Sequence, residues 1–211
     1  MDAINRETYE TIAKEFAETR AYVWQCVKSF AGQIRTGDEV LEIGCGNGKN
    51  MEYVGKVTGA TVQGIDTCRR FVDICERKGL KVAYGDSKDL VFPTNRFDCV
   101  MCVAMFHHLL SQEDRDRSMR EMIRVLRPGG VGLLTCWSTE QPDGGKFCFT
   151  EGVNPVPWKG RRAEKAAVMR YYYVYSRAMF ESYFRSFPEI VVETVYWEVG
   201  NWILVFRKRA S

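Results

Sequence analysis

The sequence lacks any apolar run near the roughly 20 residues that a helix needs to cross a bilayer. Its polar start, with Asp2, Arg6 and Glu7, is unlike a secretory signal peptide. No internal repeat and no low-complexity segment is present, and a net charge of +3 does not by itself indicate a nucleic-acid partner. A length of 211 residues with 45% hydrophobic content suits one globular domain. We therefore expect a single domain over 1–211 and no membrane association.

The cysteines lack the spacing of a metal site or a disulfide framework. There are eight, and five of them lie in or beside predicted strands: Cys45, Cys68, Cys99, Cys102 and Cys136. Cys99 and Cys102 form a C-x-x-C, but residues three apart on a strand point to opposite faces and cannot bind one metal ion. The sequence predicts free, buried thiols, no metal, and a cytoplasmic location in which thiols stay reduced, with the nucleus as an additional possibility.

Predicted strands and helices alternate from about residue 39 onward. The strands are 39–44, 61–66, 81–84, 97–105 and 131–137, and the helices are 48–57, 69–78 and 111–126. The last helix is expected to stop at Pro128-Gly129-Gly130. This alternation predicts an α/β fold, in which a parallel sheet has helices on both faces.

The segments around this core differ in character. Residues 7–34 read as one or two amphipathic helices, within an N-terminal helical region of 1–36. The stretch 138–175 is too long for a simple connecting loop without a function of its own, and it is rich in Gly, Pro, aromatic and basic residues. It is followed by a helix over 176–187 and by strands 190–198 and 202–208, which form a hairpin around Gly200-Asn201.

The basic residues of the 138–175 stretch are clustered. They are Lys159, Arg161, Arg162, Lys165 and Arg170. Such a cluster is either a solvated surface or an anion and phosphate contact, and the sequence leaves both readings open.

Residues 40–48 (VLEIGCGNG) carry the most information. An apolar run stops at three closely spaced glycines, and a helix can start directly afterwards. Glycine tolerates positive φ and lets the backbone approach a ligand, so Gly44 and Gly46 indicate a nucleoside-binding turn. The Gly-Lys-Ser/Thr ending of a phosphate loop is missing, which argues for a cofactor without a phosphate cradle.

Two acidic residues follow on successive strands. Asp66 ends the second strand, where a carboxylate accepts the hydrogens of a ribose diol. Asp86 follows the third strand and could accept a hydrogen bond from an adenine amino group. Each could instead cap the helix or turn after it. The order of glycine turn, Asp66 and Asp86 is more specific than any one of them.

This trio resembles the S-adenosylmethionine methyltransferases of the Rossmann-like class. Phe97-Asp98 and residues 124–130 (RVLRPGG) are similar to their later motifs. The resemblance implies a seven-stranded, mostly parallel sheet with an antiparallel C-terminal hairpin, and S-adenosylmethionine as cofactor. The cofactor-binding residues that it implies are Glu42, Gly44, Cys45, Gly46, Asp66, Asp86 and Ala104. A dinucleotide oxidoreductase is the rival, but Asn50 replaces its third glycine.

The flanking segments resemble a narrower family, the eukaryotic tRNA wobble-uridine carboxymethyl O-methyltransferases. The similar segments are 9–20 with Trp24 and Val27, 42–49, 104–109, 137–141, 156–158, 170–172 and 200–202. One departure is Tyr173, where that family usually has His; another is Ala178-Met179-Phe180, where it has Gly-Glu-Leu nearby. The resemblance implies methylation of the carboxylate of 5-carboxymethyluridine at the wobble position, giving the methyl ester.

By this resemblance and by their place near the strand ends, Arg20, His107 and Arg170 are expected to hold the substrate carboxylate as a cationic clamp. The expected substrate-binding residues are His108, Trp137, Tyr171, Asn201 and Trp202. Each has a structural alternative, because arginines cover surfaces, histidines and tyrosines lie in cores, and strand-end tryptophans either pack or stack on bases.

Two rival functions remain open at this point. One is a methyltransferase that acts on a small molecule or lipid, and the other is an inactive scaffold that keeps the cofactor fold. The family resemblance further implies a heterodimer with a small zinc-binding activator protein at the third strand. Phe71 and Ile74 on the preceding helix are the expected apolar contacts.

Overall fold

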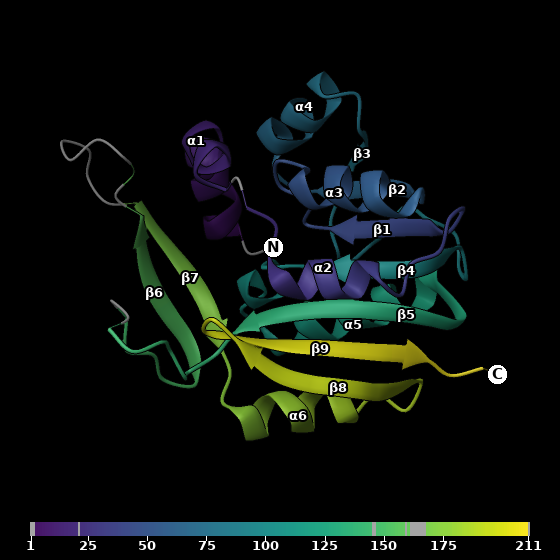
Figure 1. Cartoon of the computed structure of the whole chain (residues 1–211). Coiled ribbons are helices and arrows are strands. Elements are labelled where there is room, and N and C mark those ends of the chain that lie inside the picture. The colour runs from purple at the N-terminus through teal and green to yellow at the C-terminus, as the bar shows by residue number, and fades with distance from the viewer. Residues whose placement is uncertain (1–2, 21, 145–146, 159, 161–167, 211) are drawn as a thin grey trace.

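The computed structural model describes residues 3–20, 22–144, 147–158, 160 and 168–210. The helices are α1 (Ala3–Thr19), α2 (Gln25–Ala31), α3 (Lys49–Thr58), α4 (Arg69–Arg77), α5 (Gln112–Val125) and α6 (Arg177–Arg185). The strands are β1 (Glu39–Ile43), β2 (Thr61–Asp66), β3 (Lys81–Tyr84), β4 (Phe97–Cys102), β5 (Leu126–Trp137), β6 (Gly152–Trp158), β7 (Val168–Val174), β8 (Ile190–Glu198) and β9 (Asn201–Lys208). Figure 1 shows their arrangement in space.

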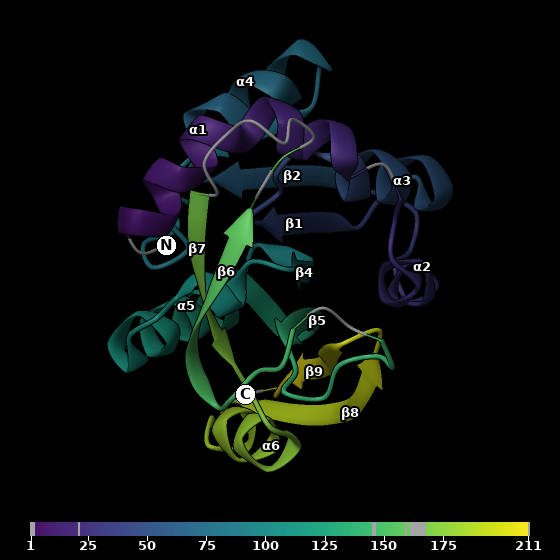
Figure 2. The same cartoon turned by 90° about the vertical axis from the view of Figure 1, so that its left-hand side faces the viewer.

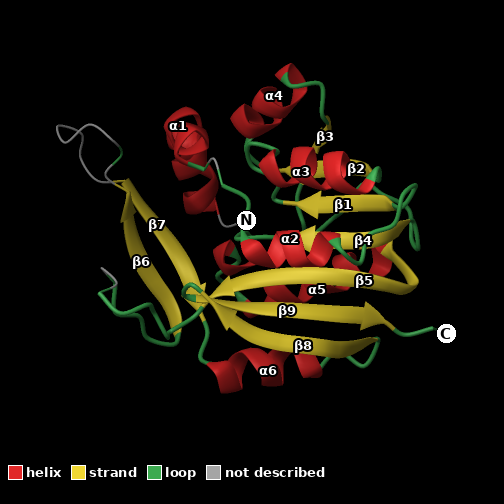
Figure 3. Ribbon diagram, viewed as in Figure 1, coloured by secondary structure: helices red, strands yellow, loops and turns green. Residues whose placement is uncertain are grey.

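Seven strands form one twisted sheet in the order β3-β2-β1-β4-β5-β9-β8. The first five pair in parallel, and β9 runs antiparallel between β5 and β8 (Figure 3). The prediction of a mostly parallel sheet closed by an antiparallel hairpin is confirmed. All five parallel strands end at one edge, where their carboxyl ends supply polar side chains.

Helices cover both faces of the sheet, as predicted. On one face, Val27 and Phe30 of α2 and Val54 of α3 pack on the central strands. On the other face, Met119 of α5 and Phe180 of α6 belong to the largest apolar cluster. The helices on these two faces leave the carboxyl edge of the sheet to other segments of the chain.

The cysteines lie as the sequence predicts. All eight are free, and seven are buried. Cys99 packs in the cluster on one face of the sheet and Cys102 in the cluster on the other. Among the described residues, no group of His, Cys, Asp and Glu could hold a metal ion, and no helix is long and apolar enough to cross a bilayer.

The sequence did not predict the hairpin of β6 and β7, which lies within 138–175. Pro155 and Pro157 argue against a strand, but β6 pairs with β7 alone, so its prolines remove no hydrogen bond on the other side. The side-chain amide of Asn5 on α1 pairs with the backbone of Tyr171 in both directions, at 2.7 and 2.8 Å. Together, α1 and the hairpin flank the carboxyl edge of the sheet (Figure 2).

Some boundaries differ from the prediction. The helix expected over 111–126 spans Gln112–Val125, close to the prediction, but the strand expected over 131–137 begins already at Leu126. The register between β4 and β5 shifts between Phe97 and Cys99, and this irregularity accommodates Pro128-Gly129-Gly130 at the start of the strand. The strand expected over 97–105 ends at Cys102 and is followed by a 3₁₀ turn over Phe106–His108.

Candidate functional site

The corner between β1 and α3 is shaped by glycine. Gly44 has a φ of 71°, and a Cβ there would lie 2.3 Å from Cγ of Met105. Gly48 caps α3 in the left-handed conformation. Only glycine adopts this conformation without strain, so the chain turns sharply while its backbone stays open to a ligand.

Asp66 forms the floor beside this corner. Its carboxylate accepts hydrogen bonds from the backbone N–H of Gly46 and of Cys68, both at 2.9 Å. The backbone N–H of Arg69, the first residue of α4, donates instead to the Glu10 carboxylate. Asp66 therefore does not cap that helix. Burial raises the pKa of Asp66 to about 6, although the two N–H donors act in the opposite direction.

Glu42 is fully buried at the end of β1. Its Oε1 accepts a hydrogen bond from the Asn50 side chain at 2.7 Å, while Oε2 has no partner among the described residues. Burial raises the pKa of Glu42 to about 8. A buried acceptor that lines a pocket and lacks a donor is suited to a cationic or N–H-bearing ligand.

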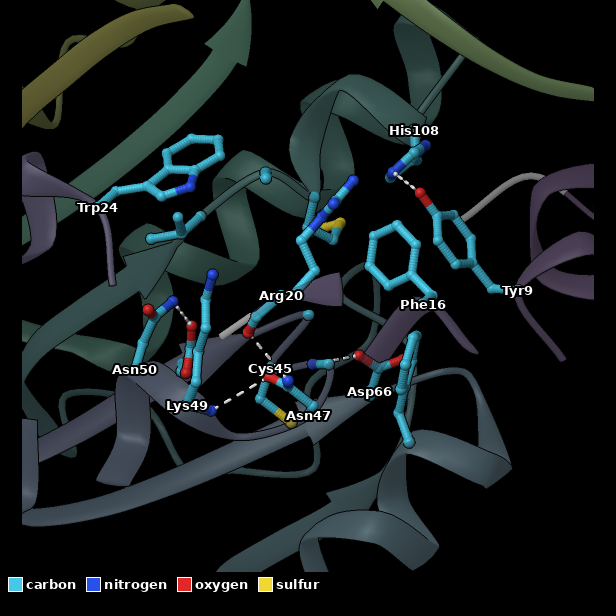
Figure 4. A pocket seen from close by; sticks show the side chains of 17 residues that line it. Tyr9, Phe16, Arg20, Trp24, Cys45, Asn47, Lys49, Asn50, Asp66 and His108 are labelled. Carbon is cyan, nitrogen blue, oxygen red and sulfur yellow. Dashed lines mark hydrogen bonds between the residues drawn. The ribbon is translucent and has the colours of Figure 1, made fainter. Parts of the chain in front are cut away.

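These residues line one pocket, which we call the glycine-corner pocket (Figure 4). Its lining comprises Tyr9, Phe16, Arg20, Trp24, Glu42, Gly44, Cys45, Gly46, Asn47, Lys49, Asn50, Asp66, Phe71, Val103, Ala104, Met105 and His108. A small hollow adjoins it at Gly44 and Asp66, and Gly85 and Ser87 lie on its other side. The Ser87 hydroxyl is buried there without a partner among the described residues.

A second pocket, which we call the aromatic pocket, opens beside the first. Its lining comprises Tyr9, Phe16, Thr19, Arg20, Tyr22, Trp24, Lys49, Ala104, His107, Trp137 and Tyr172. Ala104 belongs to both pockets and has a φ of 55°, an uncommon conformation for a residue with a Cβ. Its N–H donates to Thr135 Oγ1 at 2.8 Å. This strained residue marks the place where the two pockets meet.

Two guanidinium groups lie close to this junction: Arg20 lines both pockets, whereas Arg170 lines neither but contacts Tyr172 of the aromatic pocket. Arg20 lies over the Phe16 ring at 4.5 Å and over Trp158 at 5.8 Å, and Arg170 lies over Trp158 and Tyr172, each at 5.2 Å. Arg170 is 5% exposed, and its Nε has no hydrogen-bond partner among the described residues. Stacking holds the planes of these groups while their N–H edges stay available for an anion.

The cations affect one another. Burial lowers the pKa of Arg20, and the positive charge of Arg170 lowers it further. Burial and the charge of Arg20 likewise lower the pKa of Lys49. Within the described part of the chain, no carboxylate forms an ion pair with any of the three. Glu42 lines the glycine-corner pocket and acts in the opposite direction on the pKa of Lys49, but like charges without an ion-pair partner among the described residues predict that an anion binds here.

His107 does not contribute charge to this clamp. It is buried in the wall of the aromatic pocket, and burial together with Arg170 lowers its pKa to about 3. The imidazole is therefore neutral at physiological pH, contrary to the expectation of a cationic role. Its ring packs at a tilt of 54° against Tyr172 with ring centroids 4.7 Å apart, and it can serve as a neutral hydrogen-bonding group.

His108 belongs to a buried polar network rather than to the aromatic pocket. The Tyr9 hydroxyl lies 3.1 Å from His108 Nε2 and 3.3 Å from the Tyr172 hydroxyl. Burial lowers the pKa of His108 well below its usual value, so this ring is neutral as well. The network fixes α1 against β7 and thereby positions the wall between the two pockets.

Trp137 lines the aromatic pocket as expected of a substrate contact. Its ring packs edge-on against Tyr172 at 4.4 Å and against Phe149 at 5.2 Å, which fixes its orientation. The turn that precedes β9 lies at the same edge of the sheet, because Asn201 pairs with Trp137. The predicted position of this turn is thus confirmed.

Three expected substrate residues, one cofactor residue and Arg170 of the expected clamp line neither pocket. Trp202 is in the core, where its indole N–H donates to Tyr175 O at 3.0 Å, and Asn201 donates to Val199 O. Tyr171 faces α1 through its backbone. Asp86 lies between Gly85 and Ser87 of the adjoining hollow and accepts from Lys88 N–H, as a turn residue does.

Sequence reasoning missed several pocket residues. Lys49 and Asn47 were passed over because they follow the glycines, where a helix start explains them equally well. Trp158 was noted only as part of a similar segment, and its place between two guanidinium groups depends on the unpredicted hairpin. Of the basic cluster, Lys159, Arg161, Arg162 and Lys165 lie outside the described residues.

Comparison with known proteins gives a consistent result. Residues 41–134 match the family model described as "Methyltransferase domain". A protein of Arabidopsis thaliana named tRNA (carboxymethyluridine(34)-5-O)-methyltransferase is 34% identical over 135 residues, which are 64% of this chain and 33% of that protein. The protein of the same name in Schizosaccharomyces pombe is 27% identical over 221 residues, covering 96% of this chain and 95% of its own. The chain thus spans about a third of the former relative and nearly all of the latter.

Solved structures share the fold at low identity. The [4+2]-cyclase SpnF superposes with a TM-score of 0.71 at 15% identity, covering 98% of this chain and 95% of its own. A chain from the complex of the Haloferax volcanii Trm112 methyltransferase activator with the putative methyltransferase gives 0.69 at 17% identity, covering 99% of each chain. A cyclase among these structures shows that the fold alone does not decide the reaction.

Proposed function

This chain contains a methyltransferase domain and is a homologue of the tRNA (carboxymethyluridine(34)-5-O)-methyltransferases, and from this premise we propose that it methylates the carboxylate of 5-carboxymethyluridine at the wobble position of tRNA. The product is the methyl ester. The observation that supports this proposal most is the group of cations Arg20, Lys49 and Arg170, which form no ion pair among the described residues. Arg20 and Lys49 line both pockets, and Arg170 contacts Tyr172 of the aromatic pocket.

The glycine-corner pocket fits S-adenosylmethionine. Asp66 would accept the ribose hydroxyls, and the unpartnered Oε2 of Glu42 would meet the ammonium group of the amino-acid end. Gly44 lines this pocket, and the Met105 side chain packs in the space that a Cβ at Gly44 would occupy. When bound, the cofactor supplies an electrophilic methyl group on a sulfonium.

His107, Trp137 and Tyr172 of the aromatic pocket would hold the substrate nucleoside. A carboxylate is ionised at neutral pH, since its unperturbed pKa is about 4, so the reaction needs no general base. The neutral state of His107 and His108 agrees with this requirement. The protein's task is to place the carboxylate in line with the methyl group, and such positioning contributes about 7–11 kcal/mol in favourable cases.

Nucleoside mass spectrometry of tRNA tests the substrate. In cells that lack this protein, the carboxymethyl precursor should accumulate and the wobble methyl ester should disappear. An unchanged ester in those cells would remove the proposed substrate.

A small molecule or lipid remains the rival substrate for the same pocket. Binding of tRNA should weaken steeply as salt increases, because phosphate contacts release counterions, whereas binding of a small substrate should change little. An inactive scaffold is the remaining alternative. It would be favoured if neither S-adenosylmethionine nor S-adenosylhomocysteine bound in an equilibrium titration.

The affinity for S-adenosylhomocysteine should fall as the pH falls through about 6. Asp66 has its pKa raised to about 6 in the free protein, so it is a carboxylate above that pH and protonated below it. The ribose hydroxyls bind best to the carboxylate, so binding must release the proton and weakens by up to about tenfold per pH unit below 6. Calorimetric titration between pH 5 and 7 measures this. Asp66→Asn should bind more weakly and show a smaller pH dependence; an affinity that rises toward pH 5 would contradict the assignment.

We also propose a heterodimer with a small zinc-binding activator at the β3 edge of the sheet. The exposed aromatic residue of β3 is Tyr84, at 50% exposure. The expected contact Phe71 is buried against Tyr9 and Phe16 in the glycine-corner pocket, so it cannot form the surface of this edge. Ile74 is half-buried in the same cluster.

The purified chain alone should be poorly soluble or weakly active, and co-expression with the activator should restore activity. Tyr84→Glu should abolish the co-purification of the two proteins, because it places a charge on the edge. Gel filtration and methyl-transfer assays check both results. Full activity of the monomer would count against the partner.

The seven buried free thiols support a cytoplasmic location, where such thiols stay reduced.

A further inference from the structure

Tyr22 is displayed at the mouth of the aromatic pocket. It lies in the loop between α1 and α2 and is 86% exposed, the largest exposure among the exposed large hydrophobic residues of the described chain. It nevertheless lines the aromatic pocket, together with Trp24 and Trp137. No hydrogen bond of its hydroxyl and no ring contact is found among the described residues. Its ring is thus an open aromatic surface at the entrance to the proposed substrate site.

The backbone of this loop is fixed to the glycine corner. Lys49 Nζ donates to Tyr22 O at 2.7 Å. The Asn47 side chain donates to Ala17 O at 3.0 Å and to Arg20 O at 3.2 Å. The Tyr22 ring therefore stands at a defined place relative to both pockets, although no side chain of the described residues covers it. This arrangement costs a ligand little conformational entropy of the backbone when it stacks there.

Trp137 and Tyr22 differ in their surroundings. Trp137 is packed by Tyr172 and Phe149 inside the pocket, whereas Tyr22 is 86% exposed at its rim. Arg20 and Lys49 supply positive charge beside Tyr22. Aromatic rings flanking cations are the usual means by which proteins hold consecutive bases and phosphates of a single strand.

We propose that the Tyr22 ring stacks on a nucleotide next to the methylated one, so that the site binds a single-stranded RNA segment rather than one nucleoside. This inference rests on the proposed function and deepens it. It gives Tyr22 a part in substrate selection: the ring adds affinity for an anticodon loop and none for free 5-carboxymethyluridine.

The test compares two substrates, a stem-loop RNA that contains 5-carboxymethyluridine and the free nucleoside. Tyr22→Ala should lower kcat/KM for the stem-loop by about 5- to 150-fold, the range for losing one base–aromatic stack. The nucleoside reaction and the affinity for S-adenosylhomocysteine should not change. Tyr22→Phe keeps the ring and should behave as wild type. Val57→Ala, an exposed apolar residue at the far end of α3, is the control for surface truncation.

An equal loss on both substrates, or no loss on the stem-loop, would overturn the proposal. Fluorescence anisotropy with the same RNA measures binding without methyl transfer, so the contact is tested even if the reaction differs. Tyr22→Ala that binds the stem-loop as tightly as wild type would also overturn it. Failure of the wild-type protein to methylate either substrate would instead count against the proposed function.

Discussion

Arg170→Met is expected to lower kcat/KM for RNA that contains 5-carboxymethyluridine by about 100- to 1,000-fold, the usual effect of removing one preorganised donor from a reacting anion. Arg170 is 5% exposed, carries no ion pair among the described residues, and has an unpartnered Nε. Its guanidinium is held over Trp158 and Tyr172. A buried positive charge of this kind is costly unless an anion compensates it in the working complex.

The affinity for S-adenosylhomocysteine should stay close to wild type in Arg170→Met, because Arg170 does not line the glycine-corner pocket. Steady-state kinetics and calorimetry separate the two effects, and thermal unfolding shows whether the variant is folded. Arg170→Lys keeps the charge but loses the planar fork, so it should recover part of the activity. Arg177→Met removes an exposed arginine of α6 and serves as the matched control. Arg170→Met with kcat/KM within about threefold of wild type, a change typical of surface substitutions, would contradict the carboxylate-binding role.

Gly44→Ala is expected to abolish measurable cofactor binding. Two effects combine at this position. An L-residue at a φ of 71° is strained by about 1–2 kcal/mol, and the new Cβ would lie 2.3 Å from Met105 Cγ and 2.5 Å from Met105 Cβ. Met105 can move only by shifting the residues between the two pockets, next to the strained Ala104. The wall of the glycine-corner pocket at Gly44 and Met105 would therefore change its shape.

Gly79→Ala is the control for strain alone. Gly79 has a φ of 73°, close to that of Gly44, and a Cβ there would meet nothing within 4 Å. Both variants should lose about 1–2 kcal/mol of unfolding free energy from the backbone. Gly44→Ala alone should lose binding of S-adenosylhomocysteine in equilibrium dialysis at a temperature where circular dichroism shows both variants folded. Retained binding in the folded Gly44→Ala protein would show that the cofactor lies elsewhere.

The core of the fold could be predicted because its signals are local. An apolar run that ends in glycines and acidic residues at successive strand ends are such signals, and the parallel pairing of β1 to β5 follows from their alternation with helices. The glycine corner and Asp66 were found by the same reasoning, since a positive φ and a ribose-binding carboxylate have characteristic positions in such sheets.

The aromatic pocket could not be predicted to the same extent, because it depends on contacts between distant segments. Asn5 and Tyr171 are 166 residues apart, and their pairing brings the hairpin against α1. That contact places Arg170 and Trp158 beside Arg20. Trp202 shows the opposite error: an aromatic residue at a strand end suits base stacking, but its indole N–H is satisfied by Tyr175 in the core.

The central claim is that the two pockets bring a methyl donor to a carboxylate of RNA, and isotope transfer tests it most directly. The protein, with its activator if activity needs one, is incubated with stem-loop RNA that contains 5-carboxymethyluridine and with S-adenosylmethionine labelled in its methyl group. The account predicts that mass spectrometry finds the label on the modified uridine and that mild alkali releases it, because an ester hydrolyses under those conditions. Label that resists alkali, or that appears on the ribose or on another base, would contradict the account.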